Sequence, residues 1–329
     1  MYGGCNLGLF LLRFLSSCCL LGRCCGGVCL VVADDVLRGH VASGKIACEV
    51  RESMRRFVRE GMSVLDVCER AESLIRQKGG KPAFPCNISV NEVAAHYTSP
   101  PGDRQIIPSG SLVKIDIGVH VDGYIADTAV TVCFDREHEF LVRTAEEVLE
   151  MAIGLLRPGL SVSKFGATVE KAIAARGCKV ISDLTGHQLG RFLVHGGKSL
   201  PNVSHLSMSK VLVGEVYAVE PFVTLPEAAG RIEYGKEAYI FRFQKNRNLK
   251  SPHAKKLLDY ISENFRTLPF TERWLQKVVP KEHYKAAFSE LLSSKALMSY
   301  PIFLEASGKP VAQAEHTVLI TPNSCQVLT

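Results

Sequence analysis

The 329-residue chain lacks long uninterrupted apolar runs, and it carries little excess charge of either sign. No uncharged apolar stretch reaches the roughly 18 residues of a membrane span, which argues against an integral membrane protein. The net charge of +6 is compatible with a ribosome or RNA surface, but solubility explains it equally well. A hydrophobic content of 47% and a charged content of 22% are typical of a globular protein with one large or two ordinary domains.

Residues 1–32 lack the features of the usual terminal segments. No positively charged start precedes their apolar region, as a signal peptide requires, and they hold neither a Cys-x-x-Cys pair nor a histidine for zinc. We therefore predict an extension that contributes nothing to the fold, ahead of a body at 33–329; a membrane or export role is the alternative. The six cysteines beyond residue 32 are scattered singly, which favours a reduced, cytoplasmic protein over a disulfide framework.

The segment Leu112–Phe134 predicts a β-hairpin on which the remaining chain is organised. It is dense in Val, Ile, Thr and Tyr, and Asp122-Gly123 in its middle favours a two-residue type I′ turn. That turn places Asp116 opposite Ala129, so Asp116 and Asp127 become diagonal neighbours, with Cβ atoms roughly 7–8 Å apart or less. Two bare carboxylates there would repel each other, and a metal between them removes the conflict. Two solvated aspartates on an exposed sheet face are the simpler alternative.

Helical patterns precede and follow the hairpin, and they contain an internal repeat. We expect helices from Asp34 or Asp35 towards Arg59, over Ser63–Gln77 with Ser63 as N-cap, and over Glu139–Leu156. Residues 59–64 (REGMSV) resemble 157–162 (RPGLSV), and 110–116 resembles 214–220, where a second strand ends in a carboxylate. These matches indicate a duplicated fold with a site between two halves. Residues 251–306 interrupt this repeated pattern, and we expect them to form a helical insertion of three helices.

Three further side chains are candidate ligands beside the two aspartates. They are His187 in LTGH, Glu220 in VEPF and Glu315 in QAEHT. Four carboxylates with one imidazole suit divalent ions such as Mn, Fe, Co or Zn, and such a set can bridge two ions about 3.5–4 Å apart. Taken singly, Glu220 could end a strand before Pro221, Glu315 could lie on an edge strand, and His187 could be a loop residue.

Together, these segments resemble the type II methionine aminopeptidases of the pita-bread family, peptidase family M24, and most closely the short archaeal-type enzymes. The resemblance covers roughly residues 36–327. It depends on KPAFP (81–85), AAHYT (94–98), KIDIGVHVDGYIADTAVTV (114–132), LTGH (184–187), EPF (220–222), TLPF-x-x-RWLQ (267–276) and QAEHT (313–317). LTGH departs from the SGH of many relatives, and we expect little consequence. The resemblance implies an α+β fold of two pseudo-symmetric halves, and a helical insertion is what distinguishes type II enzymes.

The resemblance also implies the residues of the site and their roles. The metal ligands would be Asp116, Asp127, His187, Glu220 and Glu315, holding two divalent ions, with Co, Mn, Fe, Zn and Ni as candidates. Glu220 would move a proton from the attacking water to the leaving amine, and His195 would hydrogen-bond the scissile carbonyl. His96 would contact the leaving nitrogen, and Phe84 would form part of the methionine pocket. Without the resemblance, His96 could be a buried, hydrogen-bonded residue and His195 a surface residue.

We therefore predict a cytoplasmic, metal-dependent aminopeptidase that removes the initiator methionine from nascent polypeptides. We expect a monomer with no specific nucleic-acid partner and no membrane partner; docking on the ribosome stays open. Two alternatives also stay open. Xaa-Pro aminopeptidase-like hydrolases share the fold and the metal set, but they usually carry an extra N-terminal domain. A non-catalytic pita-bread protein would bind RNA or a protein partner, but such proteins lose ligands, and none is lost here.

Overall fold

The computed structural model describes residues 34–329, and the expectations for residues 1–32 lie outside it. The predicted first helix is α1 (Asp34–Phe57), and the second is α2 (Val64–Gln77). Ser63 is the N-cap of α2, and its hydroxyl accepts a hydrogen bond from the Asp66 backbone N–H, as expected for this position. Both helices therefore begin and end within a few residues of the predicted positions.

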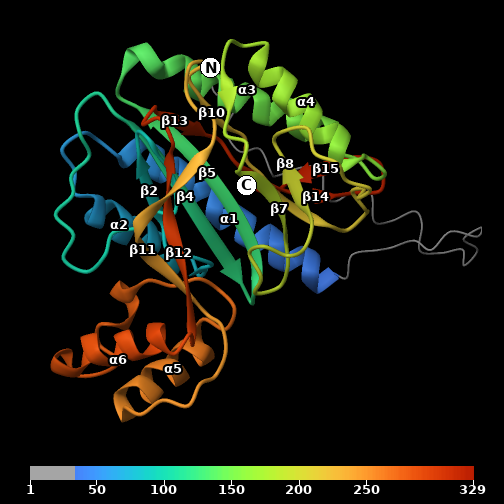
Figure 1. Ribbon diagram of the computed structural model, residues 1–329. Helices are drawn as coiled ribbons and strands as arrows, with labels where there is room; N and C mark the ends of the chain where they lie inside the picture. Colours follow the sequence, from blue (N-terminus) through green and yellow to red (C-terminus); the bar gives the residue numbers. More distant parts are fainter. Residues whose placement is uncertain (1–33) are drawn as a thin grey trace, which may run out of the picture. The chain divides into compact units, whose positions relative to one another are not determined.

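The predicted hairpin is present, with the predicted register. Val121 pairs with Tyr124, and Asp116 pairs with Ala129. Asp122 and Gly123 have φ angles of 51° and 89°, as a type I′ turn requires. Helix α1 packs across both arms, with α2 beside it (Figure 1). The strands of this first half are β1 (Lys81–Pro82), β2 (Asn87–Val90), β3 (Val93–Ala95), β4 (Leu112–Val121) and β5 (Tyr124–Cys133).

The second half repeats local features of the first. Ser161 caps α4 (Val162–Ala174) as Ser63 caps α2, and each serine forms an isolated antiparallel bridge, to Lys210 and Ile106 respectively. The repeat seen in the sequence thus has a structural counterpart. The other elements of this half are η1 (Arg136–His138), α3 (Glu139–Leu155), β6 (Lys179–Val180), β7 (Thr185–Leu189), β8 (Ser199–Pro201), β9 (Val216–Val219), β10 (Phe222–Thr224), β13 (Val311–Gln313), β14 (His316–Ile320) and β15 (Cys325–Val327).

The expected insertion is helical only in part. Helices α5 (Pro252–Asn264) and α6 (Lys281–Ser293) pack together at the end of the long pair of β11 (Ile232–Phe243) and β12 (Leu297–Glu305) (Figure 1). The segment expected as a middle helix contains only the short 3₁₀ turn η2 (Glu272–Leu275), which lies between Pro269 and Pro280. The end of the range predicted as helical is strand β12, because its residues pair with β11.

The strands of residues 34–329 form four sheets, in the orders β1-β4-β2 with β5 on β4, β13-β10-β6, β11-β12-β3, and β15-β14-β9-β7-β8. One apolar core packs α1 and α2 on β4 and β5, and another packs α3 and α4 on the strands of the second half. Ala129 of β5 and Glu315, between β13 and β14, exchange two backbone hydrogen bonds and so join the halves. Across 34–329 we find no helix with the length and hydropathy that crossing a membrane requires.

Candidate metal centre

The five predicted ligands line one cavity of about 610 Å³, although they come from both halves of the sequence. Two lie on the arms of the hairpin, in β4 and β5, and the imidazole lies at the middle of β7. Glu220 directly follows β9, and Glu315 lies between β13 and β14. We call these residues the ligand cluster: Asp116, Asp127, His187, Glu220 and Glu315.

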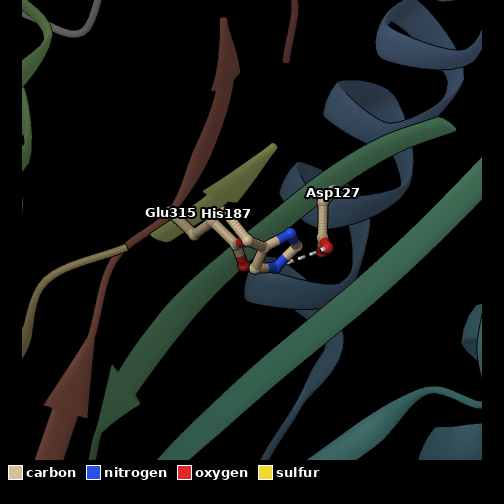
Figure 2. A group of neighbouring side chains, drawn as sticks. All are labelled: Asp127, His187 and Glu315. Atoms are coloured by element: carbon tan, nitrogen blue, oxygen red, sulfur yellow. Dashed lines mark ion pairs between the residues drawn. The ribbon is translucent and has the colours of Figure 1, made fainter. Parts of the chain in front are cut away.

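The imidazole of His187 lies among the carboxylates. Its Nε2 atom is 3.8 Å from Asp127 Oδ2 and 3.3 Å from Glu220 Oε1. Potential ligand atoms of Asp127, His187 and Glu315 all lie within 4.8 Å of one another, and Figure 2 shows the three side chains converging on one point. This spacing is compatible with a cation between them.

Hydrogen bonds fix the backbone segments that carry these ligands. The Thr317 hydroxyl accepts from the Asp127 N–H at 2.7 Å and donates to the Asp127 carbonyl at 2.7 Å. The Thr128 hydroxyl donates to the Glu315 carbonyl at 2.8 Å. Asn202 donates to the carbonyl of Glu220 at 2.9 Å. The ligands therefore project from strands that are held to one another, which preorganises the site.

Burial opposes ionisation of the carboxylates. It raises the pKa of Asp116, Asp127 and Glu315 well above their ordinary values, and the neighbouring carboxylates raise each pKa further. Burial also raises the pKa of Glu220 to about 8 and lowers the pKa of His187 to about 4. Without a cation the cluster is therefore strained electrostatically, since four carboxylates cannot all ionise there at low cost.

Unpartnered polar atoms show that the donor set fits a metal. Asp116 Oδ1 and Asp127 Oδ1 are buried with no hydrogen-bond partner. Buried polar atoms are normally paired, and unpaired carboxylate oxygens are compatible with a role in binding an ion. Carboxylate oxygens with one imidazole nitrogen are ligands for borderline divalent cations. The residues present therefore fit a divalent metal.

The other three predicted site residues line the same cavity. The ring of His195 lies 4.5 Å from that of His187, centroid to centroid. His96 has a φ of 67°, a strained value for a residue with a side chain, and its Nδ1 lies 3.3 Å from the Pro301 carbonyl oxygen. Phe84 packs on Gly118, where a Cβ atom would lie 2.3 Å from the aromatic ring.

Sequence reasoning missed two polar residues beside the ligand cluster. Gln313 Nε2 lies 3.4 Å from Glu220 Oε2 and 3.5 Å from Glu315 Oε2, so one amide bridges two proposed ligands. Gln313 lies two residues before Glu315 in the sequence, and this spacing is the signal that could have identified it. Asn87 pairs with Asp116 in the β2–β4 register, and its buried Oδ1 has no hydrogen-bond partner. No motif pointed to it.

Comparison with known proteins gives the family. The model of metallopeptidase family M24 matches residues 39–322, which is most of the chain. The chain belongs to metallopeptidase family M24. The methionine aminopeptidase of Methanothermobacter thermautotrophicus is 40% identical over 298 residues, which are 89% of this chain and 99% of that protein. For a member of M24, the ligand cluster indicates an enzyme that uses divalent metal.

Solved structures of lower identity confirm the fold. A thermophilic Arx1 superposes with a TM-score of 0.75 at 21% identity, covering 91% of each chain. The methionine aminopeptidase of Thermotoga maritima superposes with a TM-score of 0.65 at 21% identity, covering 90% of this chain and 97% of the other. The pita-bread fold predicted from the sequence is therefore confirmed.

Proposed function

We infer that the chain is a methionine aminopeptidase that removes the initiator methionine from nascent polypeptides. The observation that carries this conclusion is the buried ligand cluster, in a chain 40% identical to a methionine aminopeptidase over nearly its whole length. All five residue types that the motif requires are present, and all five face one cavity. This arrangement favours an enzyme over a non-catalytic relative that has lost ligands.

We propose that the cluster holds two divalent ions, with Asp127 shared between them. Mn, Fe, Co, Zn and Ni all suit one imidazole among carboxylates. When bound, such ions lower the pKa of water and polarise a carbonyl group. The shared position of Asp127 is supported by its contacts, because it approaches His187 and lies beside Glu315.

The remaining chemistry belongs to side chains of this chain. Glu220 takes the proton of the attacking water and delivers it to the leaving amine, a general acid–base role. His195 donates a hydrogen bond to the carbonyl oxygen as negative charge develops there. His96 contacts the leaving nitrogen, and the Pro301 carbonyl and the ring of Phe303, 4.2 Å away, hold its ring.

The apolar wall of the cavity supports selection of methionine. Phe84, Phe222 and Ile240 line it, and an unbranched thioether gains from dispersion and sulfur–aromatic contact. Selection by fit alone is limited to about 1–3 kcal/mol per methylene. We therefore expect methionine to be preferred over leucine moderately rather than absolutely.

The finer biological assignments are proposals as well. We propose that the enzyme acts in the cytoplasm as a monomer, on the N-termini of nascent chains. Docking on the ribosome is compatible with the mild positive charge of +6. We propose no specific nucleic-acid partner and no membrane partner.

Peptide hydrolysis by the full chain tests the proposed function. The purified protein, loaded separately with Mn, Co or Zn, should release methionine from Met-Ala-Ser, and not from its N-acetylated form. Ala-Pro-Ser is the control for Xaa-Pro activity. Cleavage of Ala-Pro-Ser in preference to Met-Ala-Ser would contradict the proposal, and so would bound metal without turnover of either peptide.

A further inference from the structure

The two halves of the chain meet at the ligand cluster through an isolated backbone bridge rather than a continuous ladder. The Glu315 N–H lies 3.1 Å from the Ala129 carbonyl, and the Ala129 N–H lies 3.4 Å from the Glu315 carbonyl. The second distance is beyond the usual range of about 2.7–3.2 Å. The spacing between Asp127 and Glu315 therefore depends also on side chains that cross this boundary. Three threonine hydroxyls do so, those of Thr128, Thr131 and Thr317.

The Thr128 hydroxyl is itself bound by a buried arginine of α1. Arg51 is 8% exposed, and its Nη1 atom donates to Thr128 Oγ1 at 2.7 Å. The same nitrogen lies 3.0 Å from His316 Nδ1. Thr128 directly follows Asp127 in the sequence, and His316 directly follows Glu315. One guanidinium nitrogen thus contacts the chain neighbour of a proposed ligand in each half.

The direction of these hydrogen bonds is fixed by the arginine. A guanidinium group only donates, so Thr128 Oγ1 and His316 Nδ1 both accept from Arg51. The Thr128 hydroxyl then donates its own proton to the Glu315 carbonyl at 2.8 Å. The charge of Arg51 has a partner on its own helix, because its Nε atom lies 3.2 Å from Glu52 Oε1. What Arg51 offers the boundary is therefore the geometry of its N–H groups.

We propose that Arg51 is a positioning residue for the metal site, whose bonds to Thr128 and His316 set the spacing between the segments that carry Asp127 and Glu315. Arg51 does not line the cavity, so it acts through these neighbours. Groups that orient the ligands of a metal commonly change its affinity by about 10–100-fold when they are removed. An effect of charge alone would have the opposite sign, because loss of a cation near carboxylates favours metal binding. The inference rests on the proposed metal site and not on the preference for methionine.

Direct binding of Mn to the metal-free full chain, measured by titration calorimetry without substrate, tests the proposal. We expect Arg51→Met to raise the Kd for Mn about tenfold. Arg273→Met is the control for lost stability, because Arg273 is also a buried arginine, and it bonds to Glu72 and Thr98 instead. Its Kd should not change. An unchanged or lower Kd in Arg51→Met, or an equal rise in both variants, would overturn the proposal. Failure of the metal site itself looks different, because the unaltered chain would then bind no Mn.

A matched pair at Thr128 tests the same bonds without changing Arg51. Thr128→Val keeps the shape of the side chain and removes the hydroxyl that links Arg51 to Glu315, and we expect the Kd for Mn to rise about tenfold again. Thr128→Ser keeps the hydroxyl and should bind Mn as the unaltered chain does. Equal Kd values for the two variants, whether raised or not, would overturn the proposal. This pair also decides the matter if Arg51→Met does not fold.

Discussion

Glu72 and Glu315 are both buried glutamates, 2% and 1% exposed, and their surroundings are opposite. The Glu72 carboxylate accepts two hydrogen bonds from Arg273, at 3.0 and 2.7 Å, and one from the Trp274 indole at 2.7 Å. It also accepts from the Cys86 N–H at 3.3 Å. We call Glu72, Arg273 and Trp274 the Glu72 cluster. Its charge is neutralised within the chain.

Glu315 faces other carboxylates instead. Its neighbours include Asp127, Glu220 and Asp116, and together with burial they raise its pKa well above the ordinary value. The Gln313 amide, at 3.5 Å, is a weak donor for so much negative charge. Since a buried charge must be compensated, the comparison separates a structural cluster from a functional one. The Glu72 cluster fastens η2 to α2, whereas the ligand cluster depends on ions from solution.

The largest effect should come from removing a ligand that both proposed ions share. Asp127→Asn should abolish activity at any metal concentration, because the change removes charge from both ion positions. Asp116→Asn should weaken one position and regain part of the activity in excess Mn or Co. Metal analysis with kinetics over a metal titration distinguishes them. Equal losses in both variants, with no recovery, would contradict this division of roles.

The next largest effect concerns a residue outside the ligand set. His195→Ala should keep its metals and a near-normal KM for Met-Ala-Ser, and lose roughly 10²–10³ in kcat. The reason is that its proposed hydrogen bond strengthens only as charge develops on the carbonyl oxygen. Metal content and steady-state kinetics decide the matter. Loss of metal would make His195 a ligand or a support for His187, and an unchanged kcat would remove it from the mechanism.

The Glu72 cluster should respond to mutation through stability, not through metal. Arg273→Met leaves the buried Glu72 without its main partner, and we expect a loss of about 3–5 kcal/mol in the free energy of unfolding. Arg76→Met is the matched control, because Arg76 is half-exposed and lies 4.0 Å from the same carboxylate; its loss should be about 0–1 kcal/mol. Urea unfolding measures both. Similar losses in the two variants would show that the buried Glu72–Arg273 pair stabilises the fold no more than the half-exposed Arg76 does.

The sequence predicted the ligand cluster better than the Glu72 cluster, and the reasons are physical. Asp122-Gly123 fixes the hairpin register, so the relation of Asp116 to Asp127 followed from local turn chemistry. His187, Glu220 and Glu315 were placed by motifs. Arg273 lies in another quoted motif, TLPF-x-x-RWLQ, but its partner is 201 residues away, and no local pattern encodes such a contact.

The same long-range contact explains one misjudged element. The segment around Arg273 has helical composition, and a regular helix was predicted there. In the structure it is the short turn η2, from which Arg273 and Trp274 both reach Glu72. Strand β12 was likewise included in the predicted helical insertion, because its pairing with β11 spans the whole insertion and leaves no local signal. In both segments, tertiary contacts rather than local propensity determined the secondary structure.

The smallest effect should come from deleting residues 1–32. This deletion tests whether either cluster depends on them. The family match begins only at residue 39, and the chain at 34–57 already forms a regular helix packed on the hairpin. We therefore expect a chain that starts at Ala33 to keep its urea midpoint, which reports on the stability of the fold, the Glu72 cluster included. It should also keep its kcat per bound metal, which reports on the ligand cluster. The full-length protein, prepared in parallel, is the control. A severalfold loss of turnover at normal stability would assign the extension to the site, whereas a lower midpoint at normal turnover would assign it to the fold.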